Sequence, residues 1–400
     1  MPVAIYVFSL CTFAFGLSEF VVAGLVSAMA SDLDASITAA GTAIAAYAFG
    51  AAIGAPFITA CLAQWRDKHI LILAMAVLAV GSVLMSMSPN LAVLLVVRFV
   101  VGLAHGVFMA VASDAATRLV DRQRAGRALS VVWIGLTLAL ALGVPLGTYL
   151  GSMWSWRMVF ASVAALGAVS IVGLLYCVPL VPNAQHAKSI SALRRIKAIL
   201  HPQLLIAAGI AALVSVATFS FFTFVSPYLL QIAGVDMTWL SAVMLLFGLC
   251  AIVGNLLGGA IVDKLDARRS IMGALIGLML TLIGLYAFGK APIIAMALIG
   301  TLGVCFFSIV TMLTLHLLML ANRYAPDATA IAAGLNIASF NLGTALGGAI
   351  GGATIAYGSL AYVPLVGALA AAMALVGMLL HKGVESVAME AAHSPLPNRR

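Results

Sequence analysis

The chain is divided into long apolar segments by short polar breaks, and this division restricts the possible fold more than any other feature. A helix needs about 20 apolar residues to cross a bilayer core of about 30 Å. Twelve segments have this character, and we place them near residues 4–29, 38–60, 69–87, 91–117, 127–150, 156–179, 204–230, 239–262, 270–289, 292–320, 328–355 and 360–382. The sequence therefore predicts an all-α protein with twelve transmembrane helices.

The composition excludes a soluble globular domain and indicates no cofactor. Of the 400 residues, 64% are hydrophobic and 8% are charged, whereas about a quarter of the residues in soluble domains are charged. The net charge of +8 does not indicate nucleic-acid binding, because the basic residues are spread over short loops. The five cysteines have neither disulfide nor metal spacing, and we predict no metal site. The chain also lacks the Gly-x-x-x-x-Gly-Lys-[Ser/Thr] loop of many ATPases.

The basic residues are distributed unequally between the two sides of the predicted bundle. Seventeen of the twenty Lys and Arg residues fall in one set of breaks and at the C-terminus, whereas the other set contains only Arg157 and Lys290. Since positively charged loops stay cytoplasmic, we expect both termini in the cytoplasm. No Lys or Arg precedes the first apolar segment, so we expect it to be a membrane span and not a cleaved signal peptide.

The longest interior break divides the chain into two sets of six spans. Within it, apolar residues recur at helical spacing opposite three basic residues, which is typical of an amphipathic helix on a membrane surface. We therefore expect an N-terminal bundle at 1–180, a cytoplasmic amphipathic linker at 181–203, a C-terminal bundle at 204–382 and a cytoplasmic tail at 383–400.

Glu19 lies near the middle of the first span, where a carboxylate costs a few kcal/mol. Intramembrane acids usually face the interior of a bundle or a water-filled path and have a function. The alternative is a packing contact made by a protonated Glu, but Ser, Thr or Asn would make such a contact at lower cost. We interpret Glu19 as the proton-binding site of a transporter.

Arg98, in the fourth span, is predicted at nearly the same depth as Glu19. Burial disfavours a charged carboxylate and a nearby Arg favours it, so a Glu between these effects can bind and release a proton. His105 is on the same helical face as Arg98, seven residues later, and could relay protons. Its alternative is a neutral His that is hydrogen-bonded between helices. We predict Glu19, Arg98 and His105 as the proton-coupling residues.

Substrate contacts are predicted from polar and aromatic side chains in the spans. The seventh span is rich in aromatic residues, whose faces suit a planar, weakly polar ligand, although lipid- or core-facing positions are the alternative for each of them. From this span we select Phe222. Asn341 lies closer to the middle of its span than Asn336 and is the preferred amide. The predicted substrate-binding residues are Glu19, Arg98, Phe222 and Asn341.

Two cytoplasmic breaks have related patterns, one after the second span and one after the eighth. The second pattern has Gly259, Asp263 and Arg268, and the first has Gln64 and Lys68 at related positions. The pattern resembles the loop Gly-x-x-x-Asp-[Arg/Lys]-x-Gly-[Arg/Lys]-[Arg/Lys] of the major facilitator superfamily. The resemblance implies that these five residues belong to gating loops. The first copy departs from the pattern, because Gln64 stands where the family has Asp.

Two further elements extend the resemblance to the twelve-span drug:proton antiporter branch. The fourth span contains Arg98-x-x-x-Gly102, and the fifth contains Gly143, Pro145 and Gly147. The second element resembles the Gly-Pro motif of antiporters, which implies a bend that blocks proton leak; tight helix packing is the alternative. The branch includes permeases for chloramphenicol resistance, arabinose efflux and purine efflux.

The resemblance implies two pseudo-symmetric six-helix bundles around a central cavity, in a bacterial inner-membrane protein that functions as a monomer. The implied function is proton-coupled export of a small neutral or zwitterionic molecule such as chloramphenicol, driven by the proton gradient without a cofactor. One alternative is efflux or uptake of a purine nucleobase, a nucleoside or a sugar. A membrane-embedded enzyme is a remote alternative, because it would need a nucleophile–base pair or a metal cluster at one depth.

Overall fold

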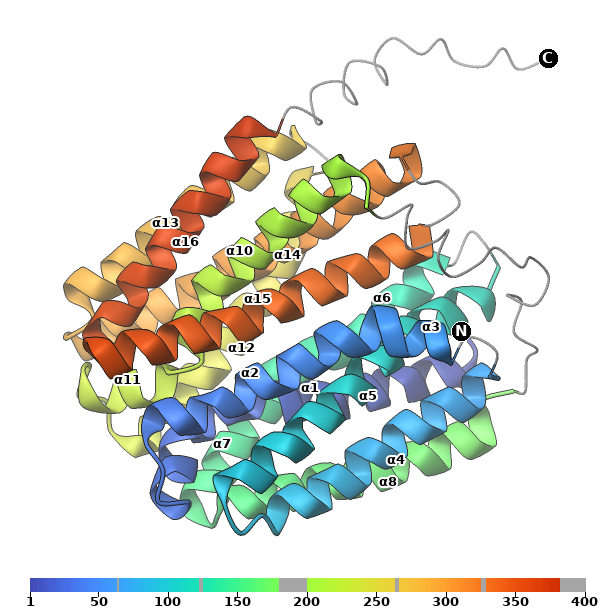
Figure 1. The fold of residues 1–400 in the computed structure, drawn as a ribbon, viewed down its shortest axis with the longest axis horizontal. Coiled ribbons are helices and arrows are strands. Elements are labelled where there is room, and N and C mark those ends of the chain that lie inside the picture. The colour runs from blue at the N-terminus through green and yellow to red at the C-terminus, as the bar shows by residue number, and fades with distance from the viewer. Residues whose placement is uncertain (63–64, 122–124, 180–199, 263–265, 325–328, 382–400) are drawn as a thin grey trace.

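The computed structural model describes residues 1–62, 65–121, 125–179, 200–262, 266–324 and 329–381. Throughout this part of the chain the regular elements are helices (Figure 1). They are α1 (Val3–Asp32), α2 (Ile37–Ile53), η1 (Gly54–Ile58), α3 (Thr59–Cys61), α4 (Asp67–Ser86), α5 (Leu91–Arg118), α6 (Ala125–Leu138), η3 (Ala139–Gly143), α7 (Val144–Met153), α8 (Trp156–Cys177), α10 (Pro202–Phe222), α11 (Val225–Gln231), α12 (Met237–Val262), α13 (Ala267–Phe288), α14 (Pro292–Tyr324), α15 (Thr329–Tyr357), η6 (Leu360–Tyr362) and α16 (Val363–Leu380).

The twelve predicted spans correspond to these helices to within a few residues at each end. Eleven of the described helical segments are long and apolar enough to cross a membrane. The helix α15 has 29 residues but is not among the eleven. Glycine, Asn and Thr residues are frequent in this helix. The predicted linker falls almost entirely outside the described residues, as does the predicted tail at 383–400.

Three spans contain an interruption close to a proline. A π-helical turn, η1, contains Pro56, and another, η3, ends two residues before Pro145. The seventh span breaks between α10 and α11, three residues before Pro227. Proline has no backbone N–H and its ring clashes with the carbonyl of residue i−4, so the regular helical hydrogen bonds cannot continue through it.

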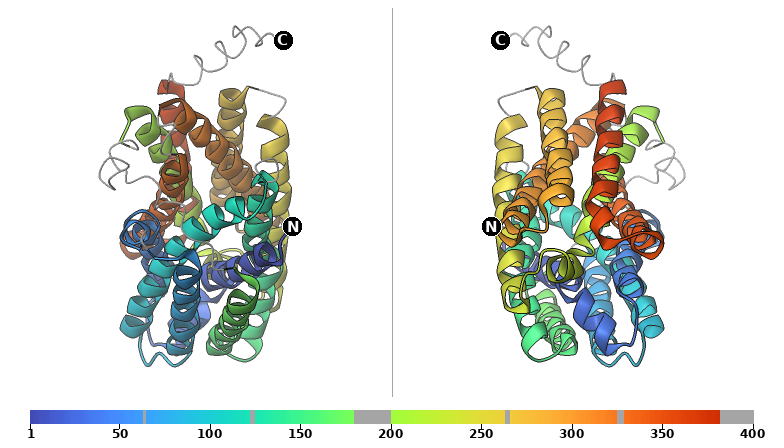
Figure 2. Two further views of the ribbon diagram at one scale, coloured as in Figure 1. Left: turned by 90° about the vertical axis from the view of Figure 1, so that its right-hand side faces the viewer. Right: turned by 90° about the vertical axis from the view of Figure 1, so that its left-hand side faces the viewer.

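The helices form two groups of six spans that pack side by side (Figures 1 and 2). Extensive contacts join α1, α2, α4, α5, α6 and α8 in the first group, and α10, α12, α13, α14, α15 and α16 in the second. The groups meet mainly through α2 against α15 and through η3 and α7 against α12. We call the end of the bundle that holds the N-terminus the terminal face. The opposite face holds the connections 33–36, 87–90, 154–155, 232–236, 289–291 and 358–359.

Close contact between the groups occurs near the opposite face. The ring of Phe224 is fully buried against glycines of both groups, and a Cβ atom placed on Gly41 of α2 would clash with it. A Cβ atom placed on Gly351 of α15 would lie 3.0 Å from the same ring. Nearby, the Ser226 hydroxyl donates a hydrogen bond of 3.2 Å to Ser27 Oγ. The two groups are therefore in direct contact at this end.

Candidate functional site

Glu19 lies in α1 with only 8% of its surface exposed. The side chain closest to its carboxyl group among the ion pairs is a histidine. The Oε2 atom of Glu19 is 3.6 Å from Nδ1 of His105, which is buried in α5. The imidazole stacks on Phe15 with ring centroids 5.0 Å apart and also contacts the ring of Tyr47 at 5.5 Å. Neither ring nitrogen has a hydrogen-bond partner among the described residues. A carboxylate and an imidazole thus form a buried pair in the first group.

Arg98 is completely buried and binds main-chain oxygens on two neighbouring helices. Its Nη1 donates to the Ser18 carbonyl at 2.5 Å, its Nε to the Ala43 carbonyl at 3.0 Å and its Nη2 to the Glu19 carbonyl at 3.4 Å. The guanidinium also lies 4.4 Å from the centre of the Tyr47 ring. Among the ion pairs of the described residues, none joins Arg98 to the Glu19 carboxylate. Arg98 therefore holds the backbone at Glu19, while His105 contacts the carboxylate.

Glycines bring α2 and α5 together so that Arg98 can reach across. A Cβ atom on Gly102 would clash with the carbonyl oxygen of Tyr47, and one on Gly106 would clash with that of Ala51. In the other direction, a Cβ atom on Gly50 of α2 would clash with the carbonyl oxygen of Phe99 on α5. Small residues at such positions allow two backbones to approach within van der Waals contact. This close approach places the Ala43 carbonyl within reach of Arg98.

A narrow cavity, too small to hold a water molecule in this conformation, borders Glu19 and is lined by both groups of helices. Its lining residues are Glu19, Phe20, Ala23, Ile44 and Ala48 from the first group, and Phe219, Phe222 and Thr344 from the second. The structure thus brings the predicted residues Glu19 and Phe222 to one cavity. Asn341 is not in this lining; it lies one turn before Thr344, and its Nδ2 donates to the Ile337 carbonyl at 2.9 Å.

Phenylalanine rings continue from this cavity into the second group. Phe222 stacks on Phe247 with ring centroids 4.3 Å apart, and Phe219 meets Phe306 edge to face at 5.7 Å. Across the boundary between the groups, Phe20 stacks with Phe219 at 6.3 Å. The rings joined in this way form the phenylalanine cluster, which comprises Phe20, Phe219, Phe222, Phe247, Phe306, Phe307 and Phe340.

The Gly-Pro element of the fifth span packs against α1. A Cβ atom on Gly143 would lie 3.2 Å from Leu17 Cδ1, and one on Gly147 would lie 2.6 Å from Val21 Cγ2. Pro145 is buried between these glycines, at the start of α7. These contacts support the packing interpretation of the motif, because any larger residue at Gly147 would push α7 away from the helix that carries Glu19.

The predicted gating loops are described only in part. Gln64 and Asp263 lie outside the described residues, and a Cβ atom on Gly259 would meet nothing within 4 Å. Lys68 donates to two carbonyl oxygens at the end of α8, those of Leu175 at 2.7 Å and Val178 at 2.8 Å. Arg268 donates to the Leu379 carbonyl at the end of α16 at 2.7 Å. In each group, a cation in the first turn of one span therefore binds the last turn of another, where helix carbonyls lack partners.

An ion cluster lies beside the first of these loops. Arg118 pairs with Asp114 one turn earlier, with 3.0 Å between Nη2 and Oδ2, as the i, i+4 spacing indicates. The same guanidinium also pairs with Asp67 at the start of α4. Asp67 stands where the family pattern has its second Gly. This acidic residue in place of Gly is the feature of the sequence that could have indicated a further partner for Arg118.

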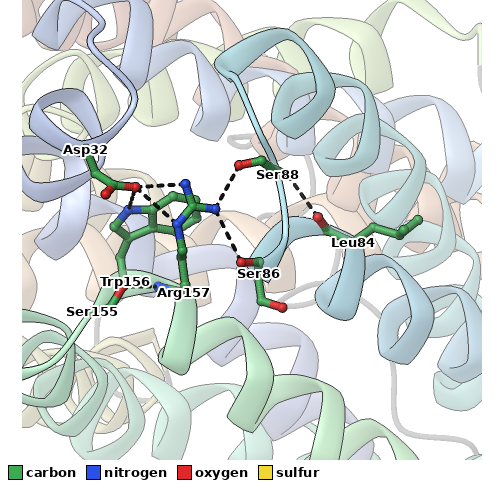
Figure 3. Close-up of polar contacts among 7 residues, drawn as sticks. All are labelled: Asp32, Leu84, Ser86, Ser88, Ser155, Trp156 and Arg157. Atoms are coloured by element: carbon green, nitrogen blue, oxygen red, sulfur yellow. Dashed lines mark hydrogen bonds and ion pairs between the residues drawn. The ribbon is translucent and has the colours of Figure 1, made fainter.

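A second network at the opposite face joins the ends of three helices of the first group (Figure 3). The Asp32 Oδ2 atom accepts hydrogen bonds from Arg157 at 2.8 and 3.1 Å and from the Trp156 indole N–H at 3.0 Å. Arg157 Nη1 also donates to the carbonyls of Ser86 at 3.3 Å and Ser88 at 2.7 Å. The network links α1, α4 and α8, and sequence reasoning did not predict it because the partners are far apart along the chain.

Sequence comparisons identify similar proteins across most of the chain. The family model of the Major Facilitator Superfamily matches residues 8–332. The inner membrane transport protein YdhP of Escherichia coli K12 is 33% identical over 364 residues, which cover 91% of this chain and 92% of YdhP. A chloramphenicol resistance protein of Streptomyces lividans is 31% identical over 89% of this chain and 90% of its own. The putative transporter AraJ of Escherichia coli K12 is 30% identical over 93% of both chains.

A comparison of structures shows the same fold in a protein of distant sequence. The crystal structure of the nucleoside transporter NupG superposes with a TM-score of 0.76, covering 96% of this chain and all of NupG. The sequence identity is 14%, so this likeness concerns the arrangement of helices alone.

Proposed function

Because the chain belongs to the Major Facilitator Superfamily, we propose that it exports a small organic molecule in exchange for protons. The family and the relatives are transporters, so the protein is a membrane transporter and not an enzyme. Names of relatives that refer to chloramphenicol resistance and to sugar efflux support the direction of transport. In the proposal, both termini are cytoplasmic and the terminal face is the cytoplasmic face.

The observation that carries this proposal is a buried acid at a cavity shared by both groups of helices. Glu19 borders the cavity and contacts His105, which is the only other ionisable side chain with which it pairs in the described structure. A proton and a substrate that both need this carboxylate cannot bind it together. Competition of this kind couples their movements in opposite directions, because each ligand leaves before the other binds.

Alternating access requires that the cavity open to one side at a time. The Phe224 ring between Gly41 and Gly351 supports a conformation in which the extracellular route is blocked. The π-helical turns η1 and η3, and the break between α10 and α11 at Phe224, interrupt helices at the boundary between the two groups. We propose that the helices bend at these sites when the cavity changes from one side of the membrane to the other.

The energy of proton exchange is sufficient for this task. One proton that moves down 100 mV yields about 2.3 kcal/mol, and each pH unit adds about 1.4 kcal/mol. A hundredfold gradient of a neutral substrate costs about 2.7 kcal/mol, as two tenfold steps. With 100 mV and one pH unit together, one proton yields about 3.7 kcal/mol, which suffices for one substrate molecule.

Everted membrane vesicles test the proposal with radiolabelled chloramphenicol as the probe. We expect wild-type vesicles to accumulate the probe when energised and to lose this accumulation on addition of a protonophore. The Glu19→Gln variant should lose gradient-driven accumulation but keep exchange of labelled for unlabelled probe. Glu385→Gln, outside the predicted spans, is the matched control. Gradient-driven accumulation at the wild-type rate in Glu19→Gln would remove this residue from coupling.

A second candidate function is proton-coupled uptake of a nucleoside or a sugar. Its support is the fold likeness to the nucleoside transporter NupG. The same vesicles distinguish the two, because an importer would expel labelled nucleoside from energised everted vesicles whereas an exporter would accumulate its substrate.

A further inference from the structure

Two amide–hydroxyl pairs join α14 to the helices on either side of it. The Thr311 hydroxyl donates to Asn255 Oδ1 on α12 at 2.9 Å, and Asn336 Nδ2 on α15 donates to Thr314 Oγ1 at 2.9 Å. The two threonines are three residues apart, so they lie on adjoining positions of one helix surface. We call these four side chains the polar cluster.

The amide of Asn336 has an acceptor that the described protein does not use. Only 7% of this residue is exposed, and its buried Oδ1 atom has no hydrogen-bond partner among the described residues. A buried carbonyl oxygen without a donor costs free energy. Helix packing alone would be served by a smaller polar residue without this oxygen. The Nδ2 donor of Asn336 has a partner, whereas its Oδ1 acceptor has none among the described residues. This arrangement is expected of an amide that is held in place and binds a ligand through its oxygen.

The polar cluster lies next to the phenylalanine cluster on each of the three helices. Asn255 follows Phe247 by eight residues, which is about 12 Å along α12 and about 80° around its axis. The polar residue is displaced toward the terminal face, because α12 runs from the opposite face to the terminal face.

The other two helices repeat this relationship. Thr311 follows Phe307 by four residues on α14, and Asn336 precedes Phe340 by four on α15, each about 6 Å along the helix. The helix α15 runs in the reverse direction, so both polar residues are again displaced toward the terminal face. On all three helices, the polar residues therefore lie closer to the terminal face than the phenylalanines do.

From this arrangement we infer that the polar cluster binds uncharged hydrogen-bond donors of the transported molecule. The inference rests on the proposed function and adds the chemical class of the substrate. The phenylalanine cluster accepts an aromatic ring by stacking or edge contacts. The polar cluster contains no ionisable side chain, so a charged group there would be buried without compensation. The substrate class is an aromatic molecule that carries hydroxyl or amide N–H groups about 6–12 Å from its ring contacts.

Equilibrium binding to the full-length protein in lipid nanodiscs tests this inference. The probes are chloramphenicol, adenosine and phenyl β-glucoside, each paired with its O-acetylated derivative, which lacks hydroxyl donors. We expect at least one parent probe to bind the wild-type protein and its acetylated partner to bind about tenfold more weakly. The Asn336→Leu variant should weaken binding of the parent about tenfold and leave the acetylated partner unchanged.

Two further variants separate recognition from folding. Asn336→Gln keeps an uncharged amide with both its donor and its acceptor, and should retain parent affinity within about threefold. Thr301→Val removes a threonine at an exposed position of α14 and should change nothing. If no parent probe binds, or if Asn336→Leu and Asn336→Gln both bind the parent as the wild type does, the inference is wrong. An equal loss for parent and acetylated probes in both Asn336 variants also contradicts it.

The outcome is independent of proton coupling, because binding in nanodiscs requires no gradient. Binding of a parent probe can also be measured in the Glu19→Gln background, with and without Asn336→Leu. If Asn336→Leu weakens binding there, the result supports the polar cluster even if the vesicle experiment contradicts proton exchange. Conversely, intact proton-driven export with no dependence of binding on Asn336 would contradict the polar cluster alone.

Discussion

The Nδ1 atom of His105 lies 3.6 Å from Oε2 of Glu19, whereas Arg98 reaches only the main-chain carbonyl of the same glutamate. The two basic side chains therefore make their direct contacts with different parts of Glu19, while the charge of Arg98 also acts on the carboxyl group through space. His105 is adjacent to the group that can carry a proton, and Arg98 determines where the helix backbone that bears this group is held. Substitutions at His105 and Arg98 separate these two roles.

Replacing His105 by Phe tests the imidazole as a proton partner. The phenyl ring can keep the stacking on Phe15 and the contact with Tyr47, but it presents no nitrogen to Glu19. We expect the thermal unfolding midpoint to change by a few degrees at most and the rate of proton-driven export to fall about a hundredfold, at the lower end of what positioned acid–base groups contribute. Export with the wild-type rate and pH profile would show that His105 only packs between helices.

Replacing Arg98 tests a structural role. Arg98→Ala leaves the carbonyls of Ser18 and Ala43 without their buried donors, and we expect a loss of about 3 kcal/mol of unfolding free energy. Arg98→Lys should recover only part of this loss, because an ammonium group lacks the planar fork that reaches two helices. Thermal unfolding in detergent measures the effect, with the exposed Arg269→Ala as control. A variant Arg98→Ala as stable as this control would refute the prediction.

Enlarging Gly41 tests the contact at the opposite face. Any Cβ atom there would clash with the Phe224 ring, so Gly41→Leu should displace this ring and favour separation of the two groups of helices. In a background without the five native cysteines, we expect a cysteine at Ser27 to react several-fold faster with an impermeant maleimide. Gly209→Leu is the control, because a Cβ atom there meets nothing within 4 Å. Equal reaction rates in both variants would argue against a closed contact at Phe224.

Neutralising Asp32 tests the network in Figure 3. The side chains of Arg157 and Asp32 are 31% and 45% exposed, so solvent screens their attraction. We expect Asp32→Asn to cost about 1 kcal/mol of unfolding free energy without changing substrate affinity, since the network joins helix ends away from the cavity. Asp34→Asn, on the same connection, is the matched control. A change in substrate affinity in Asp32→Asn would connect the network to binding.

Several features of the site could be predicted because they depend on single residues in their local sequence. An acidic side chain in a membrane-spanning segment is costly whichever helices surround it. Glu19 could therefore be identified as a candidate from the sequence of its own segment. Arg98 followed from its predicted depth, which matches that of Glu19, and His105 followed from its spacing to Arg98 along one helix face. Phe222 was selected for its aromatic surface, and the cavity beside Glu19 includes it.

Other features depend on contacts between distant segments. Asn341 was preferred for its depth, but the cavity lining includes Thr344 one turn later and not Asn341. Depth says nothing about the rotation of a helix about its axis. The partners of Asp67 and Asp32, and the pairing of Asn336 with Thr314, likewise arise from helices that adjoin only in the folded protein.

The sequence by itself determined the number and positions of the spans, because the cost of placing polar groups in hydrocarbon is paid locally by each segment. It also determined that one of these spans contains an acid near its middle. Only the tertiary structure decided that His105, and not Arg98, adjoins the Glu19 carboxylate. The reason is that helix rotation and separation depend on packing, and here glycines bring the backbones of α2 and α5 into contact and direct Arg98 toward main-chain oxygens.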